Sequence, residues 1–475
     1  MCESKGVTPT VLSGAVVLSN ATRYSGPTPQ PVWVVTGLTQ LDSGQHGACC
    51  TLSTQQGCLG QARPACGFRN ELYLGDKLFR RAASLENVSL MSFYIDYDTP
   101  NPKGEMYKLS GGKLYFCAGP NDSSPPIVEL SLLRSVFSSS GRVTIHNKSQ
   151  ARGVSGVRVS NLVVEKIASY AQSAAVETTC SLEDANASMP NCKWQISGVE
   201  VRFSHGRGIN NHNGASVVNS SAHHCGQLGF GGSSGVVSGC EIAWNNQAFF
   251  ATGWEAGGGK WVNHLGHLEI SQCWVHDNFG DGLWADVASV DIEYSRNILV
   301  NNSGAGISHE ISYTAVIEGN YASSNGYGFQ VWLWSGQIQI QNSRDIIVRN
   351  NTVVVRSGAA NGIVIVQQNR SCIGCWPAGS LYPSLPPLPA KNVTVTNNTV
   401  SAHWAPPFPT LPLATNTMLI CDRSSLQTAM GQSGRSLITL SWIWQSRAIA
   451  STPTPTFYEG PSQLPANRNI IGPGR

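Results

Sequence analysis

Short apolar runs recur at a regular spacing between about residue 155 and residue 400. Each unit contains a short β run, a polar turn that often includes Asn, and a second β run that usually opens on Gly. The first apolar residues of the second runs are Ile209, Phe230, Phe249, Leu283, Ile307, Ile338 and Ile363. This spacing indicates a repeat period in the low twenties, lengthened by insertions at Gly253–Gly266 and Gly326–Gly336.

A period of this length without any helical stretch predicts an all-β solenoid, in which parallel strands coil around one core. Leucine-rich repeats have a similar length but need a leucine and helix pattern, and propeller blades need about 40 residues. Asn residues recur at the turns, where they tolerate left-handed backbone and where stacked amides can bond to one another. These turn residues are Asn246, Asn278, Asn302, Asn325 and Asn351.

The pattern divides the chain into three parts. Residues 1–150 show alternating runs between Gly, Pro and Ser clusters, which predicts an N-terminal β-rich capping region. A solenoid needs such a cap because its terminal coil exposes unpaired backbone groups. Residues 151–400 form the predicted β-helix, a single-domain solenoid. Residues 401–475 are rich in Pro and Thr, which is typical of a flexible tail.

Composition narrows the possible partners. The chain has 475 residues, 49 Gly, 12% charged residues and a formal net charge of +3. Without a Lys/Arg tract there is no electrostatic case for nucleic acid or for an anionic membrane. No apolar run reaches the roughly 18 residues that a membrane span needs. We therefore expect neither nucleic acid nor a membrane as partner, and we expect a monomer.

Cysteines and sequons favour a secreted or extracellular protein. Cys180 with Cys192, and Cys372 with Cys375, are candidate disulfides, although the second pair could instead be half of a zinc site. N-x-S/T sequons are frequent, but Asn and Thr are also common at solenoid turns. The sequons lie at Asn20, Asn87, Asn121, Asn147, Asn186, Asn219, Asn301, Asn350, Asn369, Asn392 and Asn397. The first residues lack the apolar core of a signal peptide, so we expect a truncated N-terminus.

Two segments carry a resemblance to a known family: DNFGDGLWAD at 277–286 and NNSGAGISHEISY at 301–313. They resemble the right-handed parallel β-helix repeat proteins of the pectate-lyase-like superfamily, over about residues 70–400. The resemblance implies a right-handed coil and relatives that include polysaccharide lyases, glycoside hydrolases and uronate epimerases. The Asp-Pro-His-Glu motif of alginate epimerases is absent, and Ser204–Gly206 resembles only one fragment of the polygalacturonase motifs.

Strand alternation predicts a pair of outward carboxylates. If Leu283 and Ile307 point into the coil, Asp286 and Glu310 point outward from neighbouring coils, about 4.8 Å apart. Two carboxylates this close raise the pKa of one of them, which suits acid–base catalysis. Their separation is also close to that of the two carboxylates of retaining glycosidases. The pair could instead share Ca²⁺, the one cofactor we consider. The alternative is a solvated pair bonded to turn amides. Trp284, Gln339 and Gln341 are expected on the same face, as substrate-binding residues.

The glycine-rich insertion adds a candidate cation. Lys260 could remove a proton beside a uronate carboxylate or stabilise the resulting charge, and the alternative is a solvated lysine on a loop. Five further residues are candidates for substrate binding, although His309 is expected to face inward and a lone His is more often structural. They are Trp254, Glu255, His276, His309 and, in the second insertion, Trp334. No set of metal ligands emerges.

These features favour a carbohydrate-active enzyme of the lyase or uronate epimerase type that acts on an extracellular acidic polysaccharide. Its catalytic residues would be Asp286, Glu310 and Lys260. A glycoside hydrolase using the two carboxylates is the near alternative. A non-catalytic glycan-binding or cell-wall protein is the alternative from another class, because a fold by itself does not choose an activity.

Overall fold

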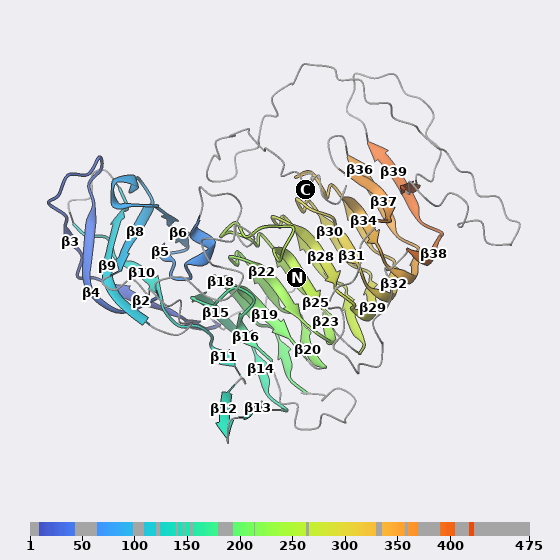
Figure 1. The fold of residues 1–475 in the computed structure, drawn as a ribbon, viewed down its shortest axis with the longest axis horizontal. Helices are drawn as coiled ribbons and strands as arrows, with labels where there is room; N and C mark the ends of the chain where they lie inside the picture. Colours follow the sequence, from blue (N-terminus) through green and yellow to red (C-terminus); the bar gives the residue numbers. More distant parts are fainter. Residues whose placement is uncertain are drawn as a thin grey trace, which may run out of the picture. The chain divides into compact units, whose positions relative to one another are not determined.

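The computed structural model contains a parallel β-helix (Figure 1). It describes residues 9–42, 64–97, 109–119, 124–138, 141–145, 148–152, 155–178, 193–212, 214–262, 266–328, 335–356, 360–368, 390–403 and 418–421. Within these residues the helical elements are two 3₁₀ turns, η1 (Pro64–Gly67) and η2 (Leu85–Asn87). The chain separates into two units, Met1–Ala429 and Met430–Arg475, and the second lies outside the described residues.

Three parallel sheets form the walls of the β-helix, and each coil contributes one strand to each sheet. Sheet I contains β11 (Phe137–Ser138), β16 (Ala174–Glu177), β19 (Arg207–Asn211), β22 (Leu228–Gly232), β25 (Gly257–Val262), β28 (Asp281–Asp286), β31 (Ile307–Glu310), β34 (Gly336–Gln341), β37 (Asn361–Val366) and β40 (Met418–Cys421). Sheet II contains β14 (Arg158–Ser160), β17 (Gln195–Ser197), β20 (Ala215–Val218), β23 (Gly235–Ser238), β26 (Leu268–Ser271), β29 (Val290–Ser295), β32 (Tyr313–Glu318), β35 (Arg344–Arg349) and β38 (Lys391–Thr396). Sheet III contains β1 (Thr10–Ser13), β15 (Leu162–Ile167), β18 (Glu200–Ser204), β21 (Ser221–His223), β24 (Glu241–Ala243), β27 (Trp274–His276), β30 (Ile298–Val300), β33 (Tyr321–Ser323), β36 (Thr352–Arg356) and β39 (Thr399–His403).

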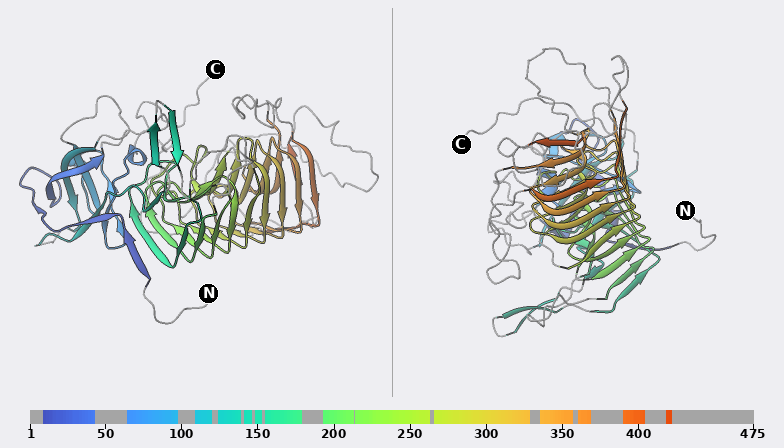
Figure 2. Two further views of the ribbon diagram at one scale, coloured as in Figure 1. Left: turned by 90° about the horizontal axis from the view of Figure 1, so that it is seen from below. Right: turned by 90° about the vertical axis from the view of Figure 1, so that its right-hand side faces the viewer.

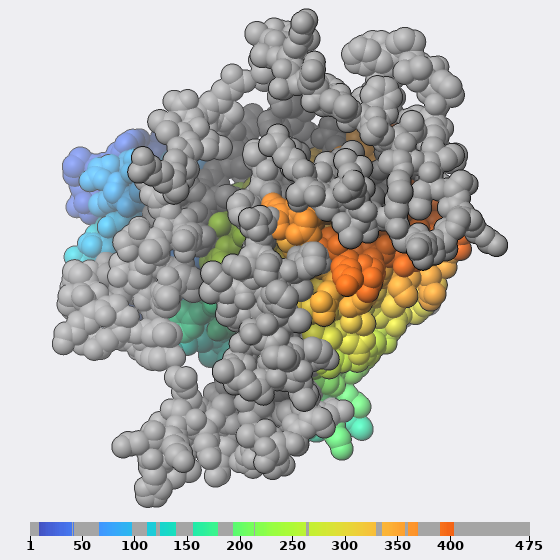
Figure 3. Space-filling model, turned by 45° about the vertical axis from the view of Figure 1, so that its right-hand side comes forward, coloured from blue at the N-terminus to red at the C-terminus, as the bar shows by residue number. Residues whose placement is uncertain are grey.

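The coils stack in chain order, so residues one repeat apart become neighbours (Figure 2). Leu283 of β28 pairs with Ile307 of β31, as the alternation predicted, and the all-β solenoid is confirmed. One inward residue on each of six strands of sheet I is at most 2% exposed, and these six residues belong to one continuous core. They are Ile209, Phe230, Leu283, Ile307, Ile338 and Ile363. The same coils form successive bands in the space-filling view (Figure 3).

One coil was misplaced by the sequence pattern. Ala248–Thr252 is not a strand of sheet I, and the place of Phe249 in the repeat belongs to Gly259 of β25, which pairs with Phe230 and Leu283. The predicted bounds of the insertion, Gly253–Gly266, are therefore wrong, because Gly257–Val262 is strand β25 and the insertion that contains Trp254 and Glu255 precedes it. The three glycines of β25 give no apolar signal. A side chain at Gly259 would lie 2.7 Å from the buried Trp261 ring, so the indole supplies the missing core volume.

Side-chain amides stack along two turns, which confirms the expected amide bonding but changes its members. The first ladder runs through Asn245, Asn278, Asn302, Asn325 and Gln337, with amide contacts of 2.8–2.9 Å. The second runs through Asn297, Asn320, Asn351 and Asn398, at 2.9–3.0 Å. Asn246, which the pattern assigned to a ladder, instead holds the insertion through the carbonyl and amide of Phe250. Each ladder amide also bonds to backbone, so the turns repeat with the coil.

The N-terminal region is β-rich, as predicted. One of its sheets contains β2 (Ala15–Leu18), β10 (Val128–Ser131), β5 (Leu72–Leu74) and β6 (Lys77–Leu78). Another contains β3 (Thr22–Arg23), β4 (Trp33–Asp42), β9 (Leu109–Cys117), β8 (Ser92–Tyr97) and β7 (Arg80–Arg81), and β12 (Gly141–Ile145) pairs with β13 (Lys148–Arg152). β1 pairs with β15 and β11 pairs with β16, which continues sheets III and I. The capping role and the three domain boundaries stay predictions.

Candidate functional site on the outer face of sheet I

The outward side chains of sheet I form a buried polar column rather than a solvated ribbon. Lys260, Trp284, Ser308 and Gln339 occupy the same register position on β25, β28, β31 and β34. They are between 0% and 4% exposed. We give the name site face to these four outward side chains and to the outward side chain that lies two positions further along each of the same strands. Burial makes every charge on this face dependent on a partner.

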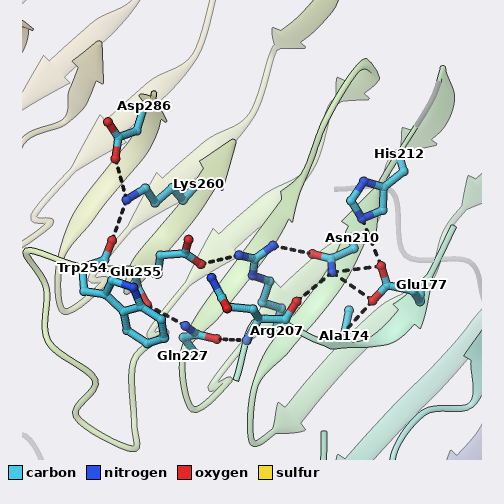
Figure 4. Close-up of polar contacts among 11 residues, drawn as sticks. Ala174, Glu177, Arg207, Asn210, His212, Gln227, Trp254, Glu255, Lys260 and Asp286 are labelled. Atoms are coloured by element: carbon cyan, nitrogen blue, oxygen red, sulfur yellow. Dashed lines mark hydrogen bonds and ion pairs between the residues drawn. The ribbon is translucent and has the colours of Figure 1, made fainter. Parts of the chain in front are cut away.

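Lys260 is held by three groups at once. Its Nζ lies 2.9 Å from Oδ2 of Asp286 and donates a hydrogen bond to the Trp254 carbonyl at 2.5 Å (Figure 4). The same ammonium lies 3.4 Å from the centroid of the Trp284 ring, a cation–π contact that is strengthened where water is excluded. The lysine is therefore not the solvated loop residue of the alternative interpretation. It is an oriented cation beside an aromatic face and a carboxylate.

Asp286 and Glu310 end the neighbouring strands β28 and β31, each one residue beyond the paired Ala285 and His309. The structure gives each carboxylate a different partner. Asp286 faces Lys260, whereas Glu310 accepts a hydrogen bond from Nε1 of Trp284 at 3.1 Å. Among the described residues, no group of three or more His, Cys, Asp or Glu is arranged to hold a metal ion. The carboxylates and Lys260 thus form one connected group around the Trp284 indole.

Asp281, the first residue of β28, was missed by the sequence reasoning. Burial raises its pKa to about 6, while the Ala305 N–H that it accepts at 2.6 Å and the Lys260 charge lower it and the Asp286 charge raises it. A carboxyl group that titrates near 6 can both accept and donate a proton at ordinary pH. The sequence did contain a signal for Asp281: it is the first residue of the strand that ends at the candidate Asp286.

A second charged network lies beside the first on sheet I. Arg207 of β19 pairs with Glu255, and both side chains are 9% exposed. Arg207 also donates to Oδ1 of Asn210 at 3.2 Å. Asn210 in turn donates to Glu177, which His212 contacts at 3.0 Å (Figure 4). These contacts connect β16, β19 and Glu255 of the insertion through the Arg207 guanidinium, the neutral Asn210 amide and two carboxylates.

Glycine makes room for this network on β22. A Cβ at Gly231 would lie 2.6 Å from Nη1 of Arg207 and 2.9 Å from Oδ1 of Asn210. Gly231 also stands between Asn210 and Lys260 in the register of sheet I. The missing side chain lets the guanidinium lie across the strand and reach Glu255.

The Trp254–Glu255 segment of the insertion is fastened to the site face by three side chains. Lys260 donates to the Trp254 carbonyl, Gln227 donates to the Glu255 carbonyl at 2.9 Å, and Arg207 pairs with the Glu255 carboxylate. Trp254 keeps partial exposure while Lys260 is only 4% exposed. The insertion therefore covers the cation, and its two predicted binding residues do lie at the site.

Three predicted binding residues do not join this group. His276 lies on β27 of sheet III, between Asp277 and Glu241, so it is not part of the site face, and its role in substrate binding stays a prediction. His309 points into the coil, as its position in the strand indicated, and contacts Tyr294. Trp334 lies outside the described residues. Gln339 and Gln341 continue the face on β34, and the buried Oε1 of Gln339 has no hydrogen-bond partner among the described residues.

Comparisons with known proteins agree with the fold. The family model described as a right handed beta helix region matches residues 185–345. The sequence-level resemblance to right-handed parallel β-helix proteins is thereby confirmed. A search among curated proteins by sequence finds no match.

Solved structures with the same fold are distant in sequence. XylC in complex with xylose is 13% identical at a TM-score of 0.53, over 83% of this chain and 73% of XylC. The periplasmic alginate epimerase AlgG is 10% identical at 0.37, over 58% of this chain and 64% of AlgG. The A-module of mannuronan C-5 epimerase AlgE6 from Azotobacter vinelandii is 15% identical at 0.29, over 54% and 77%. The likeness to XylC shows the fold.

Proposed function

We propose that this protein is a carbohydrate-active enzyme that acts on an acidic polysaccharide as a lyase or uronate epimerase. The observation that carries the proposal is the cluster of Lys260, Asp286 and Trp284 with Asp281 on the same strand. It combines a cation for a uronate carboxylate, an aromatic face for a sugar ring and a carboxyl group that titrates near 6. XylC, whose structure holds xylose, is consistent with a carbohydrate ligand.

The proposed chemistry begins at the carbon beside the uronate carboxylate. The carboxylate takes the place of the Trp254 carbonyl at the Lys260 ammonium, and the ionised Asp281 removes the proton from C5. The electrons of that C–H bond move into the carboxylate, whose growing charge Lys260 stabilises. In a lyase these electrons then return to form the C4–C5 double bond, the C4–O4 bond breaks, and the leaving O4 takes the proton that Asp281 accepted. In an epimerase C5 instead receives a proton from water on its other face. Asp286 keeps Lys260 oriented, and Glu310 holds the Trp284 indole.

A glycoside hydrolase is the second candidate, and the raised pKa of Asp281 favours it too. A hydrolase needs one protonated and one ionised carboxyl group, which is achieved when the environment separates the two pKa values. Asp281 would then donate a proton to the leaving oxygen, with Asp286 or Glu310 as the ionised partner. The direction of the pH dependence separates the two mechanisms, as argued below.

Replacing Lys260 by methionine should lower turnover at least about a hundredfold, because the charge that stabilises the intermediate is lost. The test is a panel of pectin, alginate, glucuronan and neutral glucans. Each is scored for unsaturated uronate absorbance, for new reducing ends and for changed sugar configuration. Lys391→Met, at an exposed lysine of β38, is the matched control. Equal activity in both variants would reject the site. If the wild type gave none of the three signals with any polymer, a non-catalytic binding protein would be the remaining interpretation.

We also propose that the protein is secreted. Cys66 is disulfide-bonded, and such bonds persist in oxidising compartments. Cys180, Cys192, Cys372 and Cys375 lie outside the described residues. Several sequon asparagines adopt positive φ at turns between strands, so the fold also explains their frequency: Asn219, Asn301, Asn350 and Asn397. No helix in the described part of the chain is long and apolar enough to cross a membrane.

Peptide mapping of protein from its native host tests the compartment. We expect Cys66 to be oxidised and at least one sequon to carry a glycan, because a secreted chain passes through an oxidising, glycosylating environment. Protein made in a reducing cytosol provides the reference map. Reduced cysteines and bare sequons throughout the native protein would instead indicate an intracellular protein.

A further inference from the structure

A second surface with the chemistry of a carbohydrate site lies on sheet III, away from the strands of the site face. Trp274, Ile298 and Tyr321 pair in register on β27, β30 and β33, so they project from the same column of three consecutive coils. They are 42%, 47% and 39% exposed, and Trp244, at the turn after β24, is 39% exposed. We call these four residues the aromatic track.

The rings of the track are held in place from behind. Trp274 stacks on His276 with centroids 3.8 Å apart and an interplanar angle of 26°, and Trp244 meets the same imidazole edge-on at 4.7 Å. The two nitrogens of His276 lie 2.7 Å from Asp277 and 3.2 Å from Glu241. Trp244 is also stacked on His224 at 5.2 Å. The stacked and edge-on contacts with His276 and His224 thus fix the indoles before any ligand binds, which lowers the entropy cost of binding.

The spacing of the track suits an extended chain of sugar rings. Trp274 and Tyr321 are two strands apart, which corresponds to about 9.6 Å along the sheet. This is close to the length of a disaccharide unit in a flat β-1,4-linked polysaccharide. The faces of such rings carry C–H groups that pack on aromatic rings, and their hydroxyls need polar partners at the edges. Glu241 and Asp277, with side chains 30% and 32% exposed, provide acceptors beside the indoles.

Charge selects among the possible glycans. The ionisable groups that contact His276 behind the track are both carboxylates, Glu241 and Asp277. A uronate polymer would meet like charge here, whereas an uncharged polymer would not. We propose that the aromatic track binds a neutral, extended β-1,4-linked polysaccharide. This site is independent of the proposed reaction on the site face, and it would hold the protein on a neutral polymer.

Affinity electrophoresis of the full chain in gels containing hydroxyethylcellulose, and titration with cello-oligosaccharides, test the proposal. Trp274→Ala and Tyr321→Ala should each weaken binding about tenfold or more, because a central aromatic anchor is removed. Trp274→Phe should retain more binding than Trp274→Ala. Ile347→Ala is the matched control, since Ile347 is an exposed apolar residue of sheet II at 38% exposure, and it should bind as the wild type does.

Two controls show whether a loss of glycan binding comes from the aromatic track itself. The thermal midpoints of the track variants should change little, because these side chains are exposed. Asp281→Asn should bind neutral glycan as the wild type does, so failure of the enzyme proposal and failure of this one can be told apart. Retention by polygalacturonate that Trp274→Ala and Tyr321→Ala weaken, together with no retention by the neutral polymer, would overturn the proposal, because the track would then bind the acidic polymer. So would equal binding by all variants, or a concentration-dependent dimer that Trp274→Ala abolishes while glycan binding is absent.

Discussion

Replacing Asp281 by asparagine should lower kcat/KM on the active polysaccharide by about 10²–10⁴-fold, the usual contribution of a positioned acid or base. The amide keeps the size of the side chain and can still accept the Ala305 N–H, but it cannot exchange the proton. Asp291→Asn is the matched control, because the side chain of Asp291 is 55% exposed and pairs only with the exposed His267 in the described structure. It should leave kcat/KM unchanged.

The pH profile then identifies the role of Asp281. Its pKa is about 6, so the carboxylate predominates above that pH and the acid below it. A lyase or epimerase that uses Asp281 as base should gain activity as the pH rises through 6. A hydrolase that uses it as acid should lose activity over the same range. Two results would exclude Asp281 from the mechanism. One is a wild-type pH profile without an inflection near 6, and the other is an inflection near 6 that persists in Asp281→Asn.

Replacing Arg207 by methionine should destabilise the fold by about 3–5 kcal/mol, because it leaves the Glu255 carboxylate buried without a counter-charge. Denaturant unfolding of the full chain measures the change. The double variant Arg207→Met, Glu255→Leu should recover most of the loss, since apolar residues of similar size remove both charges. Recovery would show that the cost comes from the uncompensated carboxylate rather than from lost packing.

An exposed ion pair on sheet II provides the control for that experiment. Arg349 and Glu318 approach to 2.7 Å, but their side chains are 46% and 35% exposed. Arg349→Met should move the unfolding midpoint little, because solvent screens such a pair. If Arg207→Met were equally harmless, the network that fastens the Trp254–Glu255 segment would not contribute to stability, and its covering of Lys260 would need another cause.

The coil could be predicted because its cause is local. Inward and outward residues alternate along each strand, and the repeat brings equivalent residues into register, so Leu283 and Ile307 were placed correctly from the sequence. β25 was missed for the same reason, since Gly257–Gly259 carries no side chains to show the alternation. The pattern also assigned Asn246 to the ladder in place of the adjacent Asn245, because both residues suit a turn.

The sequence by itself determined the solenoid and the strand that bears Trp284 and Asp286. Only the tertiary structure decided what these groups do to one another. Register placed Lys260 against Asp286 and Trp284, and burial raised the pKa of Asp281. His276 is close to Asp281 in the sequence but lies on a different sheet. A turn between His276 and Asp281 carries the chain from sheet III to sheet I. Sequence distance within one coil says little about which wall a side chain faces, because each coil visits all three walls.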